Sequence, residues 1–95
     1  MRGISVKEAA AIAGGRLINE INADREILSV AIDSRKVENG AMFAALRGEH
    51  VDGHDYIARA FELGAVCCLA EFAPEGVSGS VIVVADVAQA MNCLL

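Results

Sequence analysis

The chain of 95 residues is long enough for one hydrophobic core and too short for two, which excludes an arrangement of two independent domains. It is 55% hydrophobic but poor in aromatic residues, a composition typical of a packed α/β domain and not of a disordered chain. Eight basic against 13 acidic residues give a net charge of -5, and no basic run longer than Arg35-Lys36 offsets it, so we expect no binding to nucleic acid.

Membrane and secreted proteins are also disfavoured. Lys7 and Glu8 stand where a signal peptide needs an apolar stretch, and no apolar run reaches the roughly 18 residues of a membrane span. Cys67, Cys68 and Cys93 lie in apolar runs without metal-ligand spacing, so we expect three buried thiols. These features predict a cytoplasmic protein that does not bind a membrane.

The first half of the chain predicts one helix and three strands. Ser5 and Glu8 form a capping box before a helix that Gly14-Gly15 ends. Alternating and β-branched residues predict strands over 16–20 and 26–33, and a short apolar run predicts another over 41–46.

The second half predicts two further strands and two helices. A helix is expected over 55–64, capped from within 52–55, and continuous apolar runs predict strands over 65–71 and 81–86 on either side of a loop. Asp86 is expected to cap a last helix. The amphipathic pattern of this helix ends on two leucines without a capping residue, so we expect the natural chain to continue. The fold class is therefore α/β: a small single domain with a mixed or parallel sheet of about four to five strands covered by helices.

Two polar loops are predicted to leave the sheet at the same edge. The first is Asp33-Ser34-Arg35 and the second is "RGEHVDGHD" over 47–55, and each follows a predicted strand. Ligand crevices of open α/β sheets form at the carboxyl ends of strands, so the pair favours a binding cleft. In the alternative interpretation Asp33 and Ser34 only make turn hydrogen bonds, Asp52 or Asp55 only caps a helix, and His54 is a surface side chain.

Other chemistry has weaker support. His50 and His54 lie near Glu49 and Asp52, which suggests a metal-binding domain, but the intervening Gly53 disfavours one helix that presents both imidazoles, and we predict no metal site. The sequence has no Gly-x-x-x-x-Gly-Lys-[Ser/Thr] loop, no Gly-x-Gly-x-x-Gly and no Gly-x-Ser-x-Gly motif. ATP binding, dinucleotide binding and serine hydrolysis therefore lack their usual sequence motifs in this chain.

The stretch "DSRKVENGAMFAALRGEHVDGHDYIARAFELGA", residues 33–65, resembles the amino-terminal domain of the Mur ligases. The resemblance rests on D-S-R, G-x-x-F-x-A-L-x-G-E, D-G-H-D-[FY] and G-A in that order, and it extends more loosely over practically the whole chain. Within the family, the segment 46–49 is more similar to the MurF type than to the MurE type.

The resemblance implies that residues 1–95 are the amino-terminal domain of a peptidoglycan-precursor ligase, which holds the UDP end of a UDP-N-acetylmuramoyl-peptide. The MurF type joins D-alanyl-D-alanine to the tripeptide form with ATP and Mg²⁺, which bind in a central domain that this chain lacks. The isolated chain is then not catalytic, and its partners are the substrate and the remaining domains. Alternatives are the same domain of a MurE enzyme, which adds the third residue to the dipeptide form, and a non-catalytic interaction module.

The family motifs also imply which residues bind the substrate. Contacts to the UDP moiety are expected from Ile32, Ser34, Glu49, His50 and Val51. Residues expected to shape the site are Arg35, Gly48, Asp52, Gly53 and His54. For Arg35 we expect a structural role, with its guanidinium bridging a carboxylate such as Asp52 or Asp55.

Overall fold

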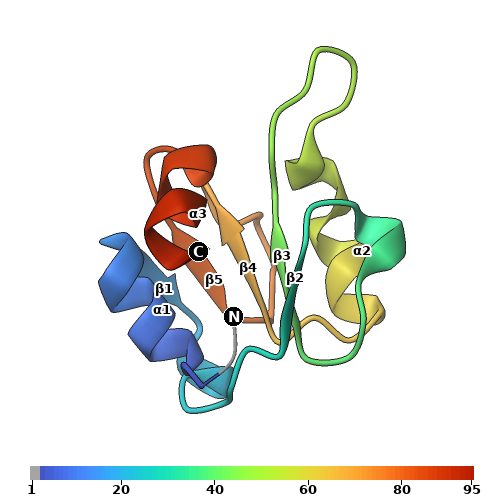
Figure 1. Ribbon diagram of the computed structural model, residues 1–95. Coiled ribbons are helices and arrows are strands. Elements are labelled where there is room, and N and C mark those ends of the chain that lie inside the picture. Colours follow the sequence, from blue (N-terminus) through green and yellow to red (C-terminus); the bar gives the residue numbers. More distant parts are fainter. Residues whose placement is uncertain (1–2) are drawn as a thin grey trace.

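The computed structural model describes residues 3–95 and builds them around one five-stranded sheet (Figure 1). The strand order is β1-β5-β4-β3-β2; β2 to β5 run parallel and β1 is antiparallel to β5. This confirms the predicted α/β fold with a mixed or parallel sheet of about four to five strands, and the sheet is mixed. The elements in chain order are α1 (Val6–Ala13), β1 (Arg16–Ile18), η1 (Glu20–Asn22), β2 (Ser29–Ala31), η2 (Ser34–Lys36), β3 (Ala41–Ala44), η3 (Gly53–Tyr56), α2 (Ile57–Glu62), β4 (Cys67–Ala70), β5 (Val81–Val83) and α3 (Val87–Leu94).

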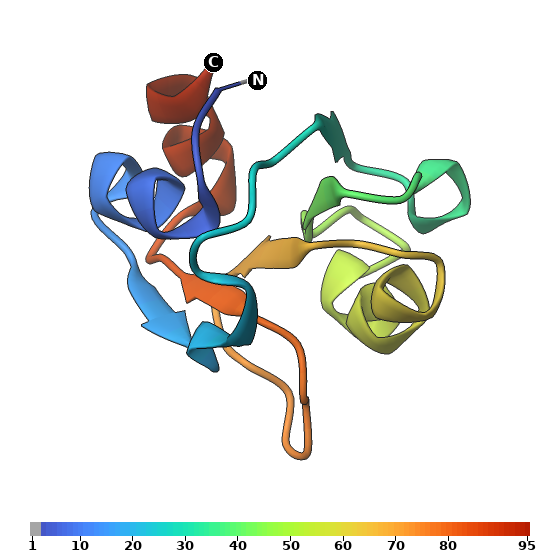
Figure 2. The same cartoon turned by 90° about the horizontal axis from the view of Figure 1, so that it is seen from below.

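Helices cover both faces of the sheet. In Figures 1 and 2, α1 and α3 lie on one side of the strands and α2 lies on the other. Met42 and Ala44 of β3 pack in the cluster beneath α1 and α3, whereas Phe43 packs in the cluster beneath α2. Successive strand residues point to opposite faces. A strand buried on both sides therefore needs apolar residues at every position, which explains the continuous runs in the sequence.

The helix ends form as the sequence predicts. The Ser5 side chain accepts from the Glu8 N–H and the Glu8 carboxylate accepts from the Ser5 N–H, which completes the capping box of α1. Gly14 ends α1 in the left-handed region at φ 68°. At the start of α3, the Asp86 carboxylate accepts from the Gln89 N–H at 3.0 Å. These caps satisfy backbone groups that a helix end leaves without partners.

Some predicted boundaries are wrong. The strand expected over 26–33 forms only over Ser29–Ala31, because the Ile27 N–H donates to the Ile4 carbonyl instead of to a neighbouring strand. The helix expected over 55–64 begins as the η3 turn and becomes α-helical only at Ile57.

The cysteines divide into two environments. Cys67 and Cys68 are buried as predicted, and burial raises the pKa of the Cys67 thiol to about 12, which makes it a poor nucleophile. Cys93 is exposed, so the prediction of three buried thiols is wrong for this residue. Val87 and Ala90 supply the buried face of α3, and Cys93 lies outside that face.

The described residues include no helix with the length and apolar character that crossing a bilayer requires.

Candidate functional site

A cavity of about 440 Å³ lies where the parallel strands β2 and β3 end. The turn after β2 forms one wall and the segment after β3 forms the other. Residues 46–53 are called the 46–53 loop below; part of it projects beyond the sheet at the top of Figure 1. The lining residues are Ile32, Asp33, Ser34, Arg35, Phe43, Leu46, Val51, Gly53 and Tyr56.

The first wall is a short turn that Asp33 holds together. Its carboxylate accepts from the backbone N–H of Arg35 at 2.9 Å, and from the guanidinium through Nε at 3.1 Å and Nη2 at 2.8 Å. The bonds from the Arg35 side chain and backbone lower the pKa of Asp33 to about 2. Ser34, nearly buried, lies between them and lines the cavity.

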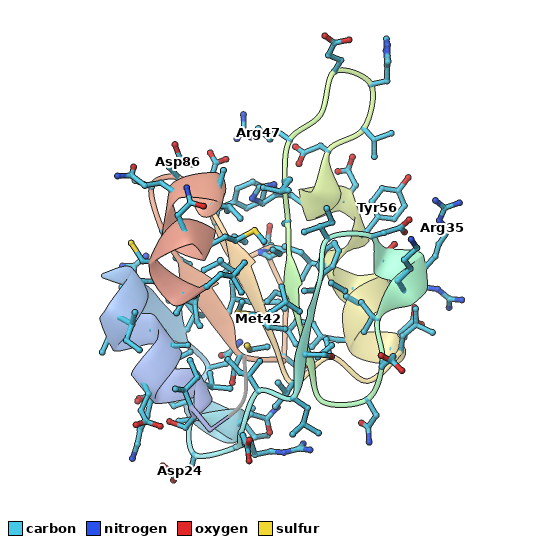
Figure 3. All side chains as sticks on the ribbon, in the orientation of Figure 1. Asp24, Arg35, Met42, Arg47, Tyr56 and Asp86 are labelled. Carbon is cyan, nitrogen blue, oxygen red and sulfur yellow. The ribbon has the colours of Figure 1, made fainter. Side chains whose placement is uncertain are left out.

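The expected bridge from Arg35 to Asp52 or Asp55 is wrong. Asp33 is only two residues away, and its two oxygens meet the fork of the guanidinium without any long-range contact. Arg35 is otherwise open to solvent, with 87% of its side chain exposed. In Figure 3 its side chain lies on the same side of the molecule as that of Tyr56.

The second wall is the 46–53 loop, whose two ends are joined at the base. The Gly53 N–H donates to the Leu46 carbonyl at 2.8 Å, and the Gly48 N–H donates to the Val51 carbonyl at 2.7 Å. A Cβ at position 53 would lie 2.8 Å from the Leu46 nitrogen and 3.0 Å from its carbonyl oxygen. This close approach of two backbone segments requires glycine.

His54, which follows the 46–53 loop directly, connects the loop to the residue after β4. Only 1% of its side chain is exposed, so the alternative of a surface histidine is wrong. Nδ1 lies 2.7 Å from the Asp52 carboxylate, and Nε2 accepts from the Glu71 N–H at 2.9 Å. The ring also stacks on Phe72, with centroids 4.5 Å apart.

The structure brings three of the five expected contact residues together. Ile32, Ser34 and Val51 line the cavity, with Ile32 and Val51 more than half exposed. Glu49 and His50 do not line the cavity. Their side chains are 94% and 91% exposed, and Oε2 of Glu49 lies 4.0 Å from Nε2 of His50.

Of the residues expected to shape the site, Arg35 and Gly53 line the cavity. Gly48 and Asp52 belong to the 46–53 loop but do not line the cavity, and His54 follows the loop and contacts Asp52. The two histidines lie in different surroundings, one exposed and one buried. Across residues 3–95 the structure gathers no three His, Cys, Asp or Glu side chains that could hold a metal ion.

Sequence reasoning placed Asp33 in the first polar loop without counting it as a site residue, and it missed three further lining residues: Phe43, Leu46 and Tyr56. Each lies inside a quoted motif, but their apolar character assigned them to the core or to the helix face. Phe43 does reach the core, with 1% exposure, and also lines the cavity, whereas Tyr56 is 42% exposed. An exposed aromatic residue beside a polar loop was the signal that could have identified Tyr56.

The lining groups suit a ligand with a planar apolar part and an anionic part. Ile32, Val51 and Tyr56 offer apolar surface, while Ser34 offers a hydroxyl and Arg35 a guanidinium. The Asp33 carboxylate beside Ser34 accepts its hydrogen bonds from Arg35. The cavity can bind and orient a ligand.

Comparison with known proteins points to one family. Residues 26–94 match the model of the Mur ligase family, catalytic domain. Two similar curated proteins are UDP-N-acetylmuramoyl-L-alanyl-D-glutamate--2,6-diaminopimelate ligases. The one from Listeria monocytogenes is 47% identical over 75 residues, which is 79% of this chain and 15% of that protein. The one from Parabacteroides distasonis is 43% identical over 72 residues, which is 74% of this chain and 15% of that protein.

Solved structures agree on the fold. MurF from Acinetobacter baumannii has a TM-score of 0.83 and 28% identity, over 95% of this chain and 20% of that chain. MurF ligase from Thermotoga maritima in complex with ADP has a TM-score of 0.55 and 29% identity, over 61% of this chain and 13% of that chain. The chain thus spans about 15% of the length of the curated relatives it matches. The family model covers most of the chain and relatives of both kinds agree with it, so the chain belongs to the Mur ligase family.

Proposed function

We propose that this chain is the amino-terminal domain of a peptidoglycan-precursor ligase and that its cavity binds the uridine diphosphate end of a UDP-N-acetylmuramoyl-peptide. The observation that carries the proposal is the cavity itself, in which Ile32, Ser34 and Val51 converge from two loops. The uracil ring lies against the apolar lining, and the diphosphate extends toward Ser34 and Arg35.

The names of the relatives support the same ligand. The curated ligases are named for addition of 2,6-diaminopimelate to UDP-N-acetylmuramoyl-L-alanyl-D-glutamate. A similar structure from Acinetobacter baumannii is named as a ligase of UDP-N-acetylmuramoylalanyl-D-glutamyl-2,6-diaminopimelate and D-alanyl-D-alanine. The two reactions differ in the added residue and share the UDP-N-acetylmuramoyl end. A domain similar to both is best explained by binding of that shared end.

Two candidates for the added residue each have an observation in their favour. The diaminopimelate ligases are 43% and 47% identical to this chain, against 28% for the MurF structure, which favours the MurE reaction. Segment 46–49 favours the MurF reaction, and so does the structural similarity to MurF from Acinetobacter baumannii, with a TM-score of 0.83 over 95% of the chain. We take the MurE reaction as the first candidate and the MurF reaction as the second. An assay of the gene product with ATP and each substrate pair, read by product mass, decides between them.

ATP and Mg²⁺ do not fit the residues of this chain. The sequence lacks the glycine-rich loop with Lys and Ser or Thr that cradles phosphates, and the described residues provide no cluster of metal ligands. In the proposed function these groups bind in another domain of a cytoplasmic protein. Sequencing beyond the codon for Leu95 tests this arrangement: we expect a Gly-x-x-x-x-Gly-Lys-[Ser/Thr] sequence in the same reading frame.

Binding to the 95-residue chain tests the proposal directly. UDP-N-acetylglucosamine should shift the NMR signals of the cavity residues with a Kd of about 1 mM, because the isolated chain offers only part of the substrate's contacts. Ser34→Ala removes one hydroxyl and should weaken binding by about fivefold. The matched control is His50→Ala, which lies outside the cavity and should bind as the wild type does. A folded chain without ligand-dependent shifts at millimolar concentrations contradicts the proposal.

A further inference from the structure

His54 is buried beside the cavity without lining it. We propose that His54, as a neutral imidazole with its proton on Nδ1, is a positioning residue that fastens the 46–53 loop to the end of β4 and thereby sets the second wall of the cavity. This inference rests on the proposed function where it concerns ligand affinity. Its structural part, the link between His54 and the loop, stands on the contacts alone.

The hydrogen-bond partners determine the tautomer. The backbone nitrogen of Glu71 can only donate, so Nε2, 2.9 Å away, must carry the lone pair. In a neutral ring the proton then sits on Nδ1 and is donated to the Asp52 carboxylate at 2.7 Å. The same oxygen of Asp52 accepts from the His54 N–H at 2.9 Å, and these bonds, the backbone one first, lower the pKa of Asp52. The carboxylate therefore stays ionised at neutral pH.

These bonds connect the loop to a distant part of the chain. Asp52 and Gly53 close the loop, and Glu71 follows directly on β4, 17 residues beyond His54. Arg47, at the other end of the loop, adds an ion pair to Glu71, with Nε and Oε2 3.5 Å apart. Val51 precedes Asp52 directly, so its place on the cavity wall depends on this attachment.

A second proton on the ring would break the link. It would place an N–H on Nε2 facing the N–H of Glu71 at a distance that now holds a hydrogen bond. The charged group in contact with the ring is the Asp52 carboxylate, and the residue that donates to Nε2, Glu71, has its own carboxylate paired with Arg47. Protonation of the ring on acidification should therefore loosen the wall and weaken nucleotide binding.

The first experiment reads the tautomer without any ligand. The chain contains only two histidines, so His50→Ala leaves His54 as the single imidazole in long-range ¹H–¹⁵N spectra. We expect the Nδ1–H form at neutral pH, and we expect the amide signals of Glu71 and Val51 to shift together with the ring as pH falls. An Nε2–H tautomer, or a Glu71 amide that ignores the titration, would overturn the inference.

The second experiment measures affinity for UDP-N-acetylglucosamine at pH 7.5 and 5.5. Each phosphate of this probe has one ester and one anhydride linkage, so the probe lacks the terminal phosphate proton of UDP, which titrates at about pH 6. Wild type and His50→Ala should each lose about fivefold or more in affinity at the lower pH, the equivalent of one lost hydrogen bond. His54→Gln keeps an acceptor for Glu71 but does not titrate, so its affinity should be the same at both values.

His54→Phe keeps the stacking on Phe72 and loses both nitrogen contacts, so it should bind about tenfold more weakly at either pH. Unaltered affinity in this variant, or a wild-type pH slope in His54→Gln, refutes the positioning role. Should the phenylalanine variant not fold, the glutamine variant and the tautomer spectra still decide the question. Absence of binding by the wild type at both pH values refutes the proposed function instead, and the ligand-free spectra then decide on the link alone.

Discussion

The two walls of the cavity are held in different ways. The turn after β2 depends on Asp33 and Arg35, which are two residues apart. The 46–53 loop depends on His54 and on residues 71 and 72, which follow α2 and β4 in the sequence. The first wall is therefore a local structure, whereas the second requires the residues that follow β4 to lie beside it. Changes at the end of β4 should disturb the second wall and leave the first intact.

The largest expected effect comes from the base of the loop. Gly53→Ala places a methyl group 2.8 Å from the Leu46 nitrogen, and backbone atoms cannot move aside as a flexible side chain would. The free energy of unfolding should fall by about 2 kcal/mol or more, measured by urea denaturation. In the matched variant Gly48→Ala, the only close atom is the Val51 carbonyl oxygen at 3.1 Å, so its loss should be much smaller. Equal losses would contradict the account of the loop base.

A smaller effect separates the two aspartates. Asp52→Ala removes the acceptor of two bonds from His54, and its amide shifts should extend to Glu71 and Phe72. Asp33→Ala should shift amides only within residues 32–36, because within residues 3–95 its carboxylate accepts hydrogen bonds from Arg35 alone. We also expect the larger drop in thermal midpoint for Asp52→Ala. Long-range shifts in the Asp33 variant would show that the first wall is not local.

The next prediction concerns pH. The pKa of Asp33 should be about 2 by NMR titration, against its ordinary value of 3.8. Because the folded pKa is lower than the unfolded one, the stabilisation is present above about pH 4 and is lost as pH falls toward 2. Arg35→Gln should raise the pKa while leaving it below 3.8, since the backbone N–H at position 35 still donates. A pKa of Asp33 that does not respond to this substitution would contradict the pairing.

The smallest effect is expected at the loop tip. His50→Ala removes a side chain that is 91% exposed and lies 4.0 Å from Glu49. Surface changes of this kind leave stability nearly unchanged, so the thermal midpoint should match that of the wild type. A clear drop would show that the tip has contacts beyond those in the structure.

The sequence predicted the local features well. Caps at Ser5 and Asp86, the continuous strands and the edge where the two polar loops meet each depend on residues close in the chain or on simple periodicity. Whether the cavity binds a nucleotide stays a prediction.

Features that depend on distant residues were missed or wrong. Nothing near His54 in the sequence indicates that the N–H of residue 71 will donate to its ring. The predicted partner of Arg35 was wrong for the opposite reason. The prediction chose Asp52 or Asp55 and overlooked the carboxylate of Asp33, two residues away. Exposure of Cys93 follows from the rotation of α3 against the sheet, which an apolar stretch alone does not determine.

The central claim is that both walls contact one uridine nucleotide. Isotope-filtered nuclear Overhauser measurements on the labelled chain with UDP-N-acetylglucosamine test it most directly. We predict contacts from the uracil H5 and H6 protons to methyl groups of both Ile32 and Val51, one from each wall. Contacts confined to another surface, or none to either methyl group under saturating ligand, would contradict the account.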